Sequence, residues 1–147
     1  MHLRKAELND CSWIYNALEE LRHPVQYSEE QFKVYYGESL QSDFFMFMVL
    51  CNDENEGERI GFVSLNKFYM PRYLGFGYEM EEFVIHKDFR GQGYSYQLIE
   101  AVKAALLIEP QNRKLIIKTN GQDSMHIYAK ALNETDLKTY QVYLNKL

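Results

Sequence analysis

The residues best suited to chemistry form one turn, Arg90-Gly91-Gln92-Gly93-Tyr94-Ser95, between an apolar segment and a helix-like segment. Backbone N–H groups at the start of a helix lack acceptors inside the helix, and the helix dipole favours negative charge there. Gly91 and Gly93 have no side chain, so the main chain can adopt positive φ and approach an anion closely. Arg90 adds a fixed positive charge with forked donors. The turn therefore predicts a diphosphate site, with the amides from Arg90 to Ser95 as donors.

Other phosphate-binding loops do not fit this turn. The dinucleotide fingerprint needs three glycines directly after a first strand, and the nucleoside triphosphate loop needs Gly-Lys followed by Ser or Thr. Neither pattern occurs here. The diphosphate is thus not expected to belong to a Rossmann cofactor or to a nucleoside triphosphate.

A second group of chemically capable side chains precedes the turn. Glu79, Glu81 and Glu82 lie in the segment from Tyr78 to Ile85, which is otherwise strand-like. Strand alternation places Glu79 and Glu81 on one face and Glu82 on the other, unless a bulge intervenes. Crowded, partly buried carboxylates have raised pKa values, which suits a general base near neutral pH. The alternative interpretation is a solvated acidic edge that attracts a cationic substrate without accepting its proton.

The surrounding elements follow from periodicity and caps. A capping box starts at Ser28, with Gln31 at its third helical position. Strands are expected over 3–6, 44–51, 59–69, 78–85, 114–119 and 139–144, and helices over 9–22, 28–41, 94–107 and 124–132. In strand 59–69, Ile60, Phe62 and Ser64 are expected to share a face. The order β-α-α-β-β-β-α-β-α-β predicts a single α/β domain over 1–147, with a mixed, mostly antiparallel sheet flanked by helices.

Charge and composition exclude several classes of binding partner. The net charge is −5 over 147 residues, which argues against nucleic acid and is compatible with a cationic amine. The longest apolar run, from Phe44 to Cys51, is too short to span a bilayer, and no leader is visible, so a cytoplasmic protein without a membrane partner is expected. Cys11 and Cys51 lack metal or disulfide spacing, and no metal site is predicted.

The stretch from Glu82 to Leu98 resembles motif A of the GNAT N-acetyltransferases, Arg/Gln-x-x-Gly-x-Gly/Ala. Arg90, Gly93 and Ser95 occupy its three defined positions. Ser95 departs from the usual Gly or Ala but is small enough to preserve the close approach. The order of elements is similar to the family fold over nearly the whole chain. The resemblance implies that fold and acetyl-CoA as the co-substrate.

The resemblance also assigns cofactor contacts. The main chain of the motif strand, at Phe83, Val84 and Ile85, would bond the pantetheine arm as if it were an added strand. The amides from Arg90 to Ser95 would meet the diphosphate. Asn120, just past the next expected strand, would contact the pantetheine.

Acid and base roles follow in the same way. Tyr128 lies in a segment that resembles the family's second signature, where a Tyr protonates the sulfur of coenzyme A. A phenol with a pKa of about 10 is a reasonable donor to a developing thiolate. Glu79 is the first candidate for the base, because it stands at the spacing from Arg90 that several family members use, and Glu82 is the second.

The expected reaction is transfer of an acetyl group from acetyl-CoA to a primary amine of a small molecule, by direct attack in a ternary complex. The family varies its acceptor through loops that correspond to residues 22–27 and 67–73. The second loop is aromatic and carries Lys67 and Arg72, which suits an amine beside an acidic group; a homodimer contact is the other interpretation. A protein or peptide N-acetyltransferase and a catalytically silent acyl-CoA sensor are the alternative functions.

Overall fold

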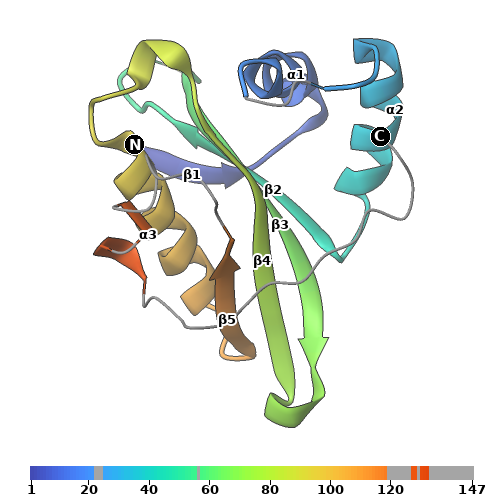
Figure 1. Cartoon of the computed structure of the whole chain (residues 1–147), viewed down its shortest axis with the longest axis vertical. Coiled ribbons are helices and arrows are strands. Elements are labelled where there is room, and N and C mark those ends of the chain that lie inside the picture. The colour runs from blue at the N-terminus through green and yellow to red at the C-terminus, as the bar shows by residue number, and fades with distance from the viewer. Residues whose placement is uncertain (22–24, 56, 119–126, 129, 133–147) are drawn as a thin grey trace.

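The structure, a computed structural model, describes residues 1–21, 25–55, 57–118, 127, 128 and 130–132. Its strands are β1 (His2–Lys5), β2 (Phe45–Cys51), β3 (Arg59–Met70), β4 (Gly75–Ile85) and β5 (Asn112–Ile117). Its helices are α1 (Cys11–Glu19), α2 (Glu29–Leu40) and α3 (Tyr94–Leu107), with short 3-10 turns at Leu8–Asp10, Pro71–Tyr73 and Lys87–Phe89 (Figure 1).

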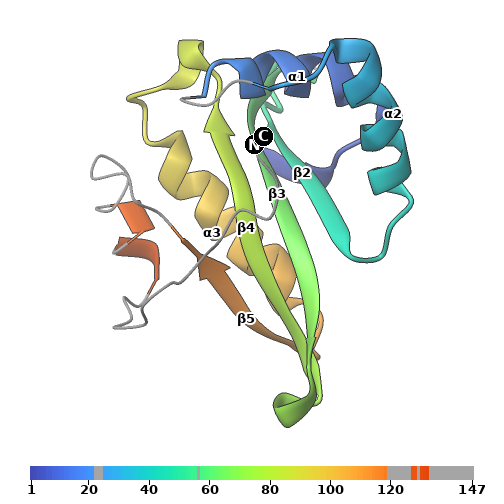
Figure 2. The same cartoon turned by 45° about the vertical axis from the view of Figure 1, so that its right-hand side comes forward.

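The five strands form one sheet in the order β1-β2-β3-β4-β5. Every neighbouring pair is antiparallel except β4 and β5, which run parallel. Helices α1 and α2 pack on one face, here called the α1/α2 face, and α3 packs on the other, the α3 face (Figure 1 and Figure 2). The predicted fold class, a mixed and mostly antiparallel α/β sheet flanked by helices, is confirmed.

Local signals located two helices well. Helix α3 has the expected bounds, and the capping box of α2 is present, with the Gln31 amide donating to Ser28 Oγ and the Ser28 amide to Gln31 Oε1. Helix α1 is shorter than expected: Asn9 lies inside a 3-10 turn, and Asp10 is the N-cap residue. Strand β4 starts earlier than expected, at Gly75, because it continues the β3 hairpin.

The expected facing of Ile60 is wrong. The register of β2 and β3 shifts between Leu50 and Cys51, where the ladder passes from Gly61 to Arg59. This bulge moves Ile60 to the α3 face, into the cluster with Val63 and Leu65, whereas Phe62 packs in the cluster of the α1/α2 face.

A buried carboxylate joins three parts of the α1/α2 half. Arg4 donates to both oxygens of Asp10 at 2.7 and 2.8 Å, Arg59 Nε donates at 2.6 Å, and the Glu7 amide donates at 2.8 Å. The Asp10 side chain is fully buried. Burial alone would raise the pKa of Asp10, but the bonds from Arg4, Glu7 and Arg59 outweigh it and lower the pKa to about 2. The cluster ties β1 to β3 through the start of α1.

Two expected elements fall largely outside the described residues. Ile127, Tyr128, Lys130 and Ala131 are helical, in agreement with the helix expected over 124–132. The rest of that helix, and the strand expected over 139–144, lie outside. Within the described ranges, none of the helices is both long and apolar enough to cross a membrane.

Candidate active site

Strand β5 pairs with only the first half of β4. Their parallel pairing runs from Phe76 opposite Asn112 to Met80 opposite Ile117. Beyond Met80, β4 continues to Ile85 beside β3, and no other described strand pairs with it. Figure 2 shows the two strands diverging toward the top of the sheet. The second half of β4 therefore presents an unpaired edge.

The alternation of hydrogen bonds between β3 and β4 determines which backbone amides and carbonyls of β4 face that edge. The His86 amide donates to the Ile60 carbonyl at 2.9 Å, so His86 directs its amide toward β3. Backbone groups alternate in direction along an antiparallel strand. The amide and carbonyl of Val84 therefore point into the β3 ladder, whereas those of Phe83 and Ile85 point to the unpaired edge.

A bulge at Glu81 changes the facing of the carboxylates. Ser64 pairs with Glu82 and the next residue of β3, Leu65, pairs with Met80, which leaves Glu81 as the inserted residue. Glu79 and Glu82 consequently share the α1/α2 face, the arrangement that simple alternation excluded. The Ser64 hydroxyl oxygen accepts from the Glu82 amide at 3.1 Å and anchors the bulge.

The two carboxylates differ in their surroundings. Glu79 forms an ion pair with Lys118, the residue that follows β5. Glu82 is half-buried, and within the described part of the chain no ion pair engages it. Burial, followed by the nearby charge of Glu81, raises the pKa of Glu82. Glu81 itself is exposed.

The glycine turn has the conformation that was expected of it. Gly91 and Gly93 have φ of 75° and 84°, and a Cβ at either position would meet nothing within 4 Å. The Arg90 amide, the first of the predicted donors, instead donates to the Lys87 carbonyl at 3.3 Å. The next amide that finds a carbonyl is that of Gln97, which donates to Gly93 at 3.3 Å. No described residue accepts a hydrogen bond from the amides of Gly91 to Ser95. The turn therefore offers a row of donors toward open space.

The guanidinium of Arg90 is bonded to other groups of the protein. Its Nε donates to the Ile85 carbonyl at 2.9 Å, and its Nη2 donates to Oε2 of Glu20 at 2.8 Å. The carbonyl of Ile85 is the last one on the unpaired edge of β4. Gln92 is also turned inward, with its side-chain amide on the Asp88 carbonyl at 3.0 Å.

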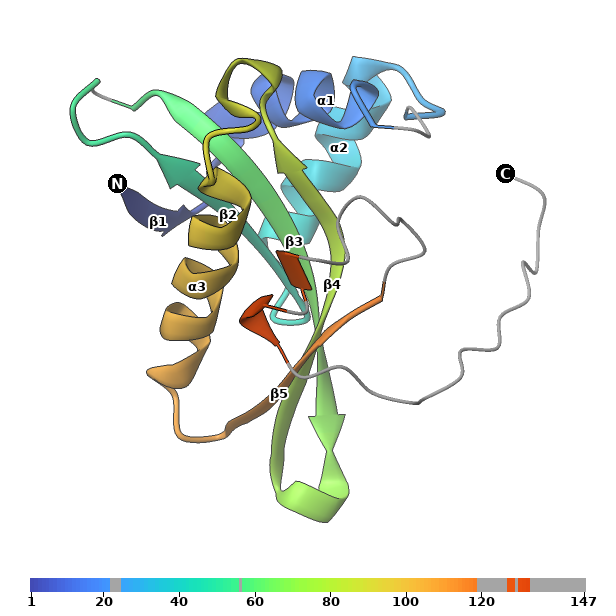
Figure 3. The same cartoon turned by 60° about the vertical axis from the view of Figure 1, so that its left-hand side comes forward.

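Tyr128 lies beside the unpaired edge. Its ring meets the ring of Phe83 edge-to-face, with centroids 6.1 Å apart, and its side chain is half-buried. The same helical segment is attached to α3, because Lys103 donates to the Ala131 carbonyl at 2.9 Å and Lys130 lies over the Tyr96 ring. Figure 3 shows this segment next to the divergence of β4 and β5. Asn120, the remaining predicted contact, lies outside the described residues.

Sequence reasoning missed two charged neighbours of the site. Lys118 neutralises Glu79, and Glu20 holds Arg90. Nothing in the local sequence marks either residue, since Glu20 and Arg90 are 70 positions apart. No group of His, Cys, Asp and Glu in the described ranges is arranged to hold a metal ion.

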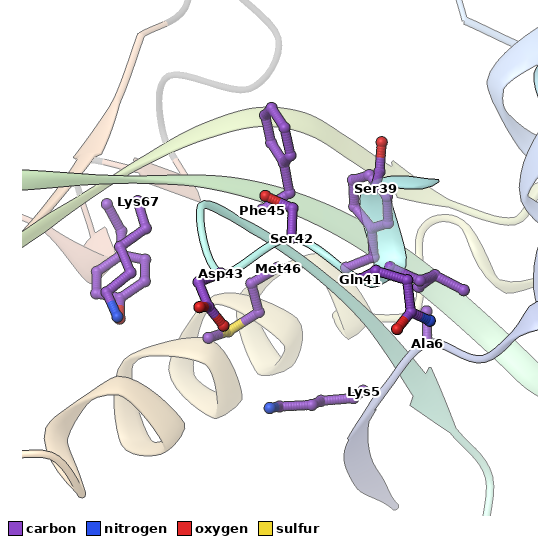
Figure 4. A pocket seen from close by; sticks show the side chains of 12 residues that line it. Lys5, Ala6, Ser39, Gln41, Ser42, Asp43, Phe45, Met46 and Lys67 are labelled. Atoms are coloured by element: carbon purple, nitrogen blue, oxygen red, sulfur yellow. The ribbon is translucent and has the colours of Figure 1, made fainter. Parts of the chain in front are cut away.

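A separate cavity of about 310 Å³ lies beside the first residues of β2, Phe45 to Phe47 (Figure 4). It is lined by residues from the end of β1, the end of α2 and the loop that follows it, the start of β2, and strands β3 and β4. Its charged lining residues are Lys5, Asp43 and Lys67. Lys67 belongs to the expected acceptor segment, whereas none of the predicted catalytic or cofactor-binding residues lines the cavity.

Comparisons with known proteins agree with the fold. The structure resembles glucosamine-6-phosphate N-acetyltransferase from Arabidopsis thaliana, with 18% identity, a TM-score of 0.77 and 97% of both chains covered. It resembles a ribosomal-protein-alanine N-acetyltransferase from Brucella melitensis biovar Abortus 2308 with 19% identity, a TM-score of 0.74, and 98% of this chain and 100% of that chain covered. A probable acetyltransferase, 14% identical, covers both chains fully with a TM-score of 0.84.

At the level of sequence, a search of curated proteins finds no match. A model of the acetyltransferase (GNAT) family matches residues 10–133, most of the chain and the whole interval from α1 to Tyr128. The match includes the unpaired edge of β4 and the glycine turn, the features that carried the resemblance of motif A. The chain therefore belongs to the GNAT acetyltransferase family.

Proposed function

We propose that the protein is an acetyl-CoA-dependent N-acetyltransferase that acetylates a primary amine of a small molecule by direct attack in a ternary complex. The proposal rests on two sets of backbone groups with which no backbone group of the described residues pairs. The outward groups of Phe83 and Ile85, of which the Ile85 carbonyl accepts from the Arg90 side chain, lead along β4 to the amides of Gly91 to Ser95.

These groups suit the two polar parts of coenzyme A. An extended pantetheine arm carries amides that can bond to a strand edge, as an added strand does. A diphosphate suits a helix N-terminus with positive-φ glycines, where no side chain blocks the approach. The open space at Gly91 and Gly93 supports this fit, because packing of the protein itself does not require glycine at either position.

Glu82 is the base that we propose, ahead of Glu79. A base must reach the amine, and its carboxylate must be available at the pH of the reaction. Glu79 is engaged by Lys118, whereas Glu82 is half-buried on the same face with a raised pKa. Glu82 would take a proton from the ammonium group, directly or through a water molecule.

The remaining proton transfer is assigned to Tyr128. The amine nitrogen attacks the acetyl carbonyl carbon, the bond from that carbon to sulfur breaks, and the thiolate leaves. Tyr128 would give its phenolic proton to that sulfur, and the second proton of the attacking nitrogen would pass through water to restore the phenol. Its position against Phe83, on the edge where the pantetheine arm would lie, supports the assignment.

The acceptor side is the α1/α2 face around Glu82. A half-buried carboxylate on this face favours a small amine over a folded protein surface. The segment 67–73, expected as an acceptor loop, is the end of β3 and the 3-10 turn that follows it. Tyr69 is five residues along β3 from Ser64, the partner of Glu82, which corresponds to about 17 Å. The similarity to a sugar-phosphate enzyme and to a protein-modifying enzyme is comparable, so neither supports one acceptor class over the other.

Release of free thiol from acetyl-CoA, measured over a panel of amino sugars, polyamines, amino acids and short peptides, tests the proposal. Turnover with at least one small amine, and less with peptides, is the expected result. Turnover with peptides alone would replace it by a peptide N-acetyltransferase. Binding of acetyl-CoA without turnover over the whole panel would replace it by a silent sensor.

A further inference from the structure

The guanidinium of Arg90 is fixed by two independent contacts. Nε is bonded to the Ile85 carbonyl and Nη2 to the carboxylate of Glu20. The Arg90 side chain is 50% exposed, and the Glu20 side chain is only 24% exposed. The cation of the turn is therefore already paired with an anion from α1.

Helix stability does not explain Glu20. It is the C-cap residue of α1, where the negative end of the helix dipole disfavours a carboxylate. The last turn of α1 carries no basic residue that would compensate. Within the described residues, the polar contact of the Glu20 side chain is the one with Arg90, so the carboxylate acts on the turn rather than on its own helix.

We propose that Glu20 sets the affinity of the turn for the cofactor's diphosphate, by pairing with Arg90 and cancelling the positive charge beside the unpaired amides. The inference rests on the proposed function, because it concerns the same diphosphate site. Glu20 is a positioning residue in this account: it acts through Arg90 and does not touch the cofactor.

The direction of the change in coenzyme A affinity follows from the two contacts of the Arg90 guanidinium. Loss of the Glu20 charge frees the guanidinium to interact with the diphosphate. The orientation of Arg90 persists, because the bond from Nε to Ile85 remains and a glutamine can still accept from Nη2. Exposed ion pairs are weak, so Glu20→Gln is expected to tighten binding of coenzyme A about threefold at low salt. The gain is expected to shrink at high salt, since the charges are accessible to counterions.

Calorimetry with coenzyme A tests the inference on four proteins: the unmodified chain, Glu20→Gln, Arg90→Met and the double variant. Glu19→Gln is the matched control, because it removes the same charge from the adjacent exposed position of α1. The expected result is a gain of about threefold for Glu20→Gln that shrinks to less than half of that in the Arg90→Met background, with Glu19→Gln near the unmodified affinity.

Weaker or unchanged binding by Glu20→Gln would overturn the inference. An equal gain with and without Arg90 would also overturn it, because Glu20 would then act on the diphosphate without Arg90. Failure of the unmodified chain to bind coenzyme A is a different result: it contradicts the proposed function itself. Thermal unfolding of each variant shows whether a change in affinity comes from loss of folded protein.

Discussion

Two polar clusters of the molecule contrast in how their hydrogen bonds are used. Around Asp10, two arginines and a backbone amide satisfy a fully buried carboxylate, and no buried side-chain polar atom of the described residues lacks a partner. At the turn from Gly91 to Ser95, the amides find no acceptor among the described residues. The first cluster is complete within the protein and serves stability. On our proposal the second is completed by the diphosphate of the cofactor, and this difference is why we place the binding site there.

The largest expected effect is at the turn. Gly93→Glu places a carboxylate where the diphosphate would lie, so we expect coenzyme A binding to fall below detection, a loss of more than about 100-fold. A non-glycine residue at this φ of 84° costs roughly 1–2 kcal/mol, so the protein should remain folded. Isothermal calorimetry with coenzyme A measures the loss.

Gly57 provides the matched control. It has φ of 81°, nothing within 4 Å of its Cβ position, and lies in the turn between β2 and β3. Gly57→Glu introduces the same strain and charge away from the site. Equal loss of affinity in both variants would mean that strain or net charge, and not the turn, explains the result.

The next largest effect distinguishes the roles of Glu79 and Glu82, the two carboxylates of the α1/α2 face. We expect Glu82→Gln to lower kcat by about 100-fold, in the range of a lost general base, and Glu79→Gln to lower it much less. The raised pKa of Glu82 also predicts the direction of the pH dependence. Because the base must be ionised, kcat/KM should fall as the pH falls through a value above the ordinary carboxyl pKa of 4.5. Initial rates of thiol release over a pH series measure both.

The opposite order, with Glu79→Gln the more damaging variant, would return Glu79 to the role of base. It would also mean that the ion pair with Lys118 opens when the acceptor binds.

A smaller effect is expected at Tyr128. Tyr128→Phe keeps the ring that packs on Phe83 and removes only the hydroxyl, so cofactor affinity should be nearly unchanged. Loss of the acid should lower kcat by at least about 10-fold. Single-turnover rates, together with coenzyme A affinity, distinguish the two effects; an unaltered rate would remove Tyr128 from the mechanism.

At Asp10 the expected change is in stability alone. Its pKa of about 2 lies below the ordinary 3.8, so the folded state gains stability that is present above pH 4 and lost as the pH falls toward 2. Linkage gives roughly 2 kcal/mol for this one group. Urea unfolding at a series of pH values measures it, and the same series on Asp10→Asn should lack this component.

Coenzyme A affinity of folded Asp10→Asn should equal that of the unmodified chain. A large loss of affinity would show that the two clusters are coupled and would break the contrast between them.

The sequence predicted what local patterns determine. The bounds of α3 and the positive φ at Gly93 follow from a helical repeat and from the absence of a side chain. The capping box of Ser28 is likewise a local signal.

Features that depend on a distant partner were not predictable. The bulge at Glu81 is set by the register against β3 and by Ser64, and it decides that Glu79 and Glu82 share a face. The pairing of Arg90 with Glu20 depends on where the end of α1 lies relative to the turn. Asn9 was a reasonable cap by type, but the two arginines that draw in Asp10 come from β1 and β3.

A crystal structure of the protein with coenzyme A is the most direct test of the proposed cofactor site. We expect diphosphate oxygens within hydrogen-bond distance of the amides between Gly91 and Ser95, and the pantetheine arm against the outward groups of Phe83 and Ile85. Coenzyme A bound elsewhere, with those amides still without an acceptor, would contradict it.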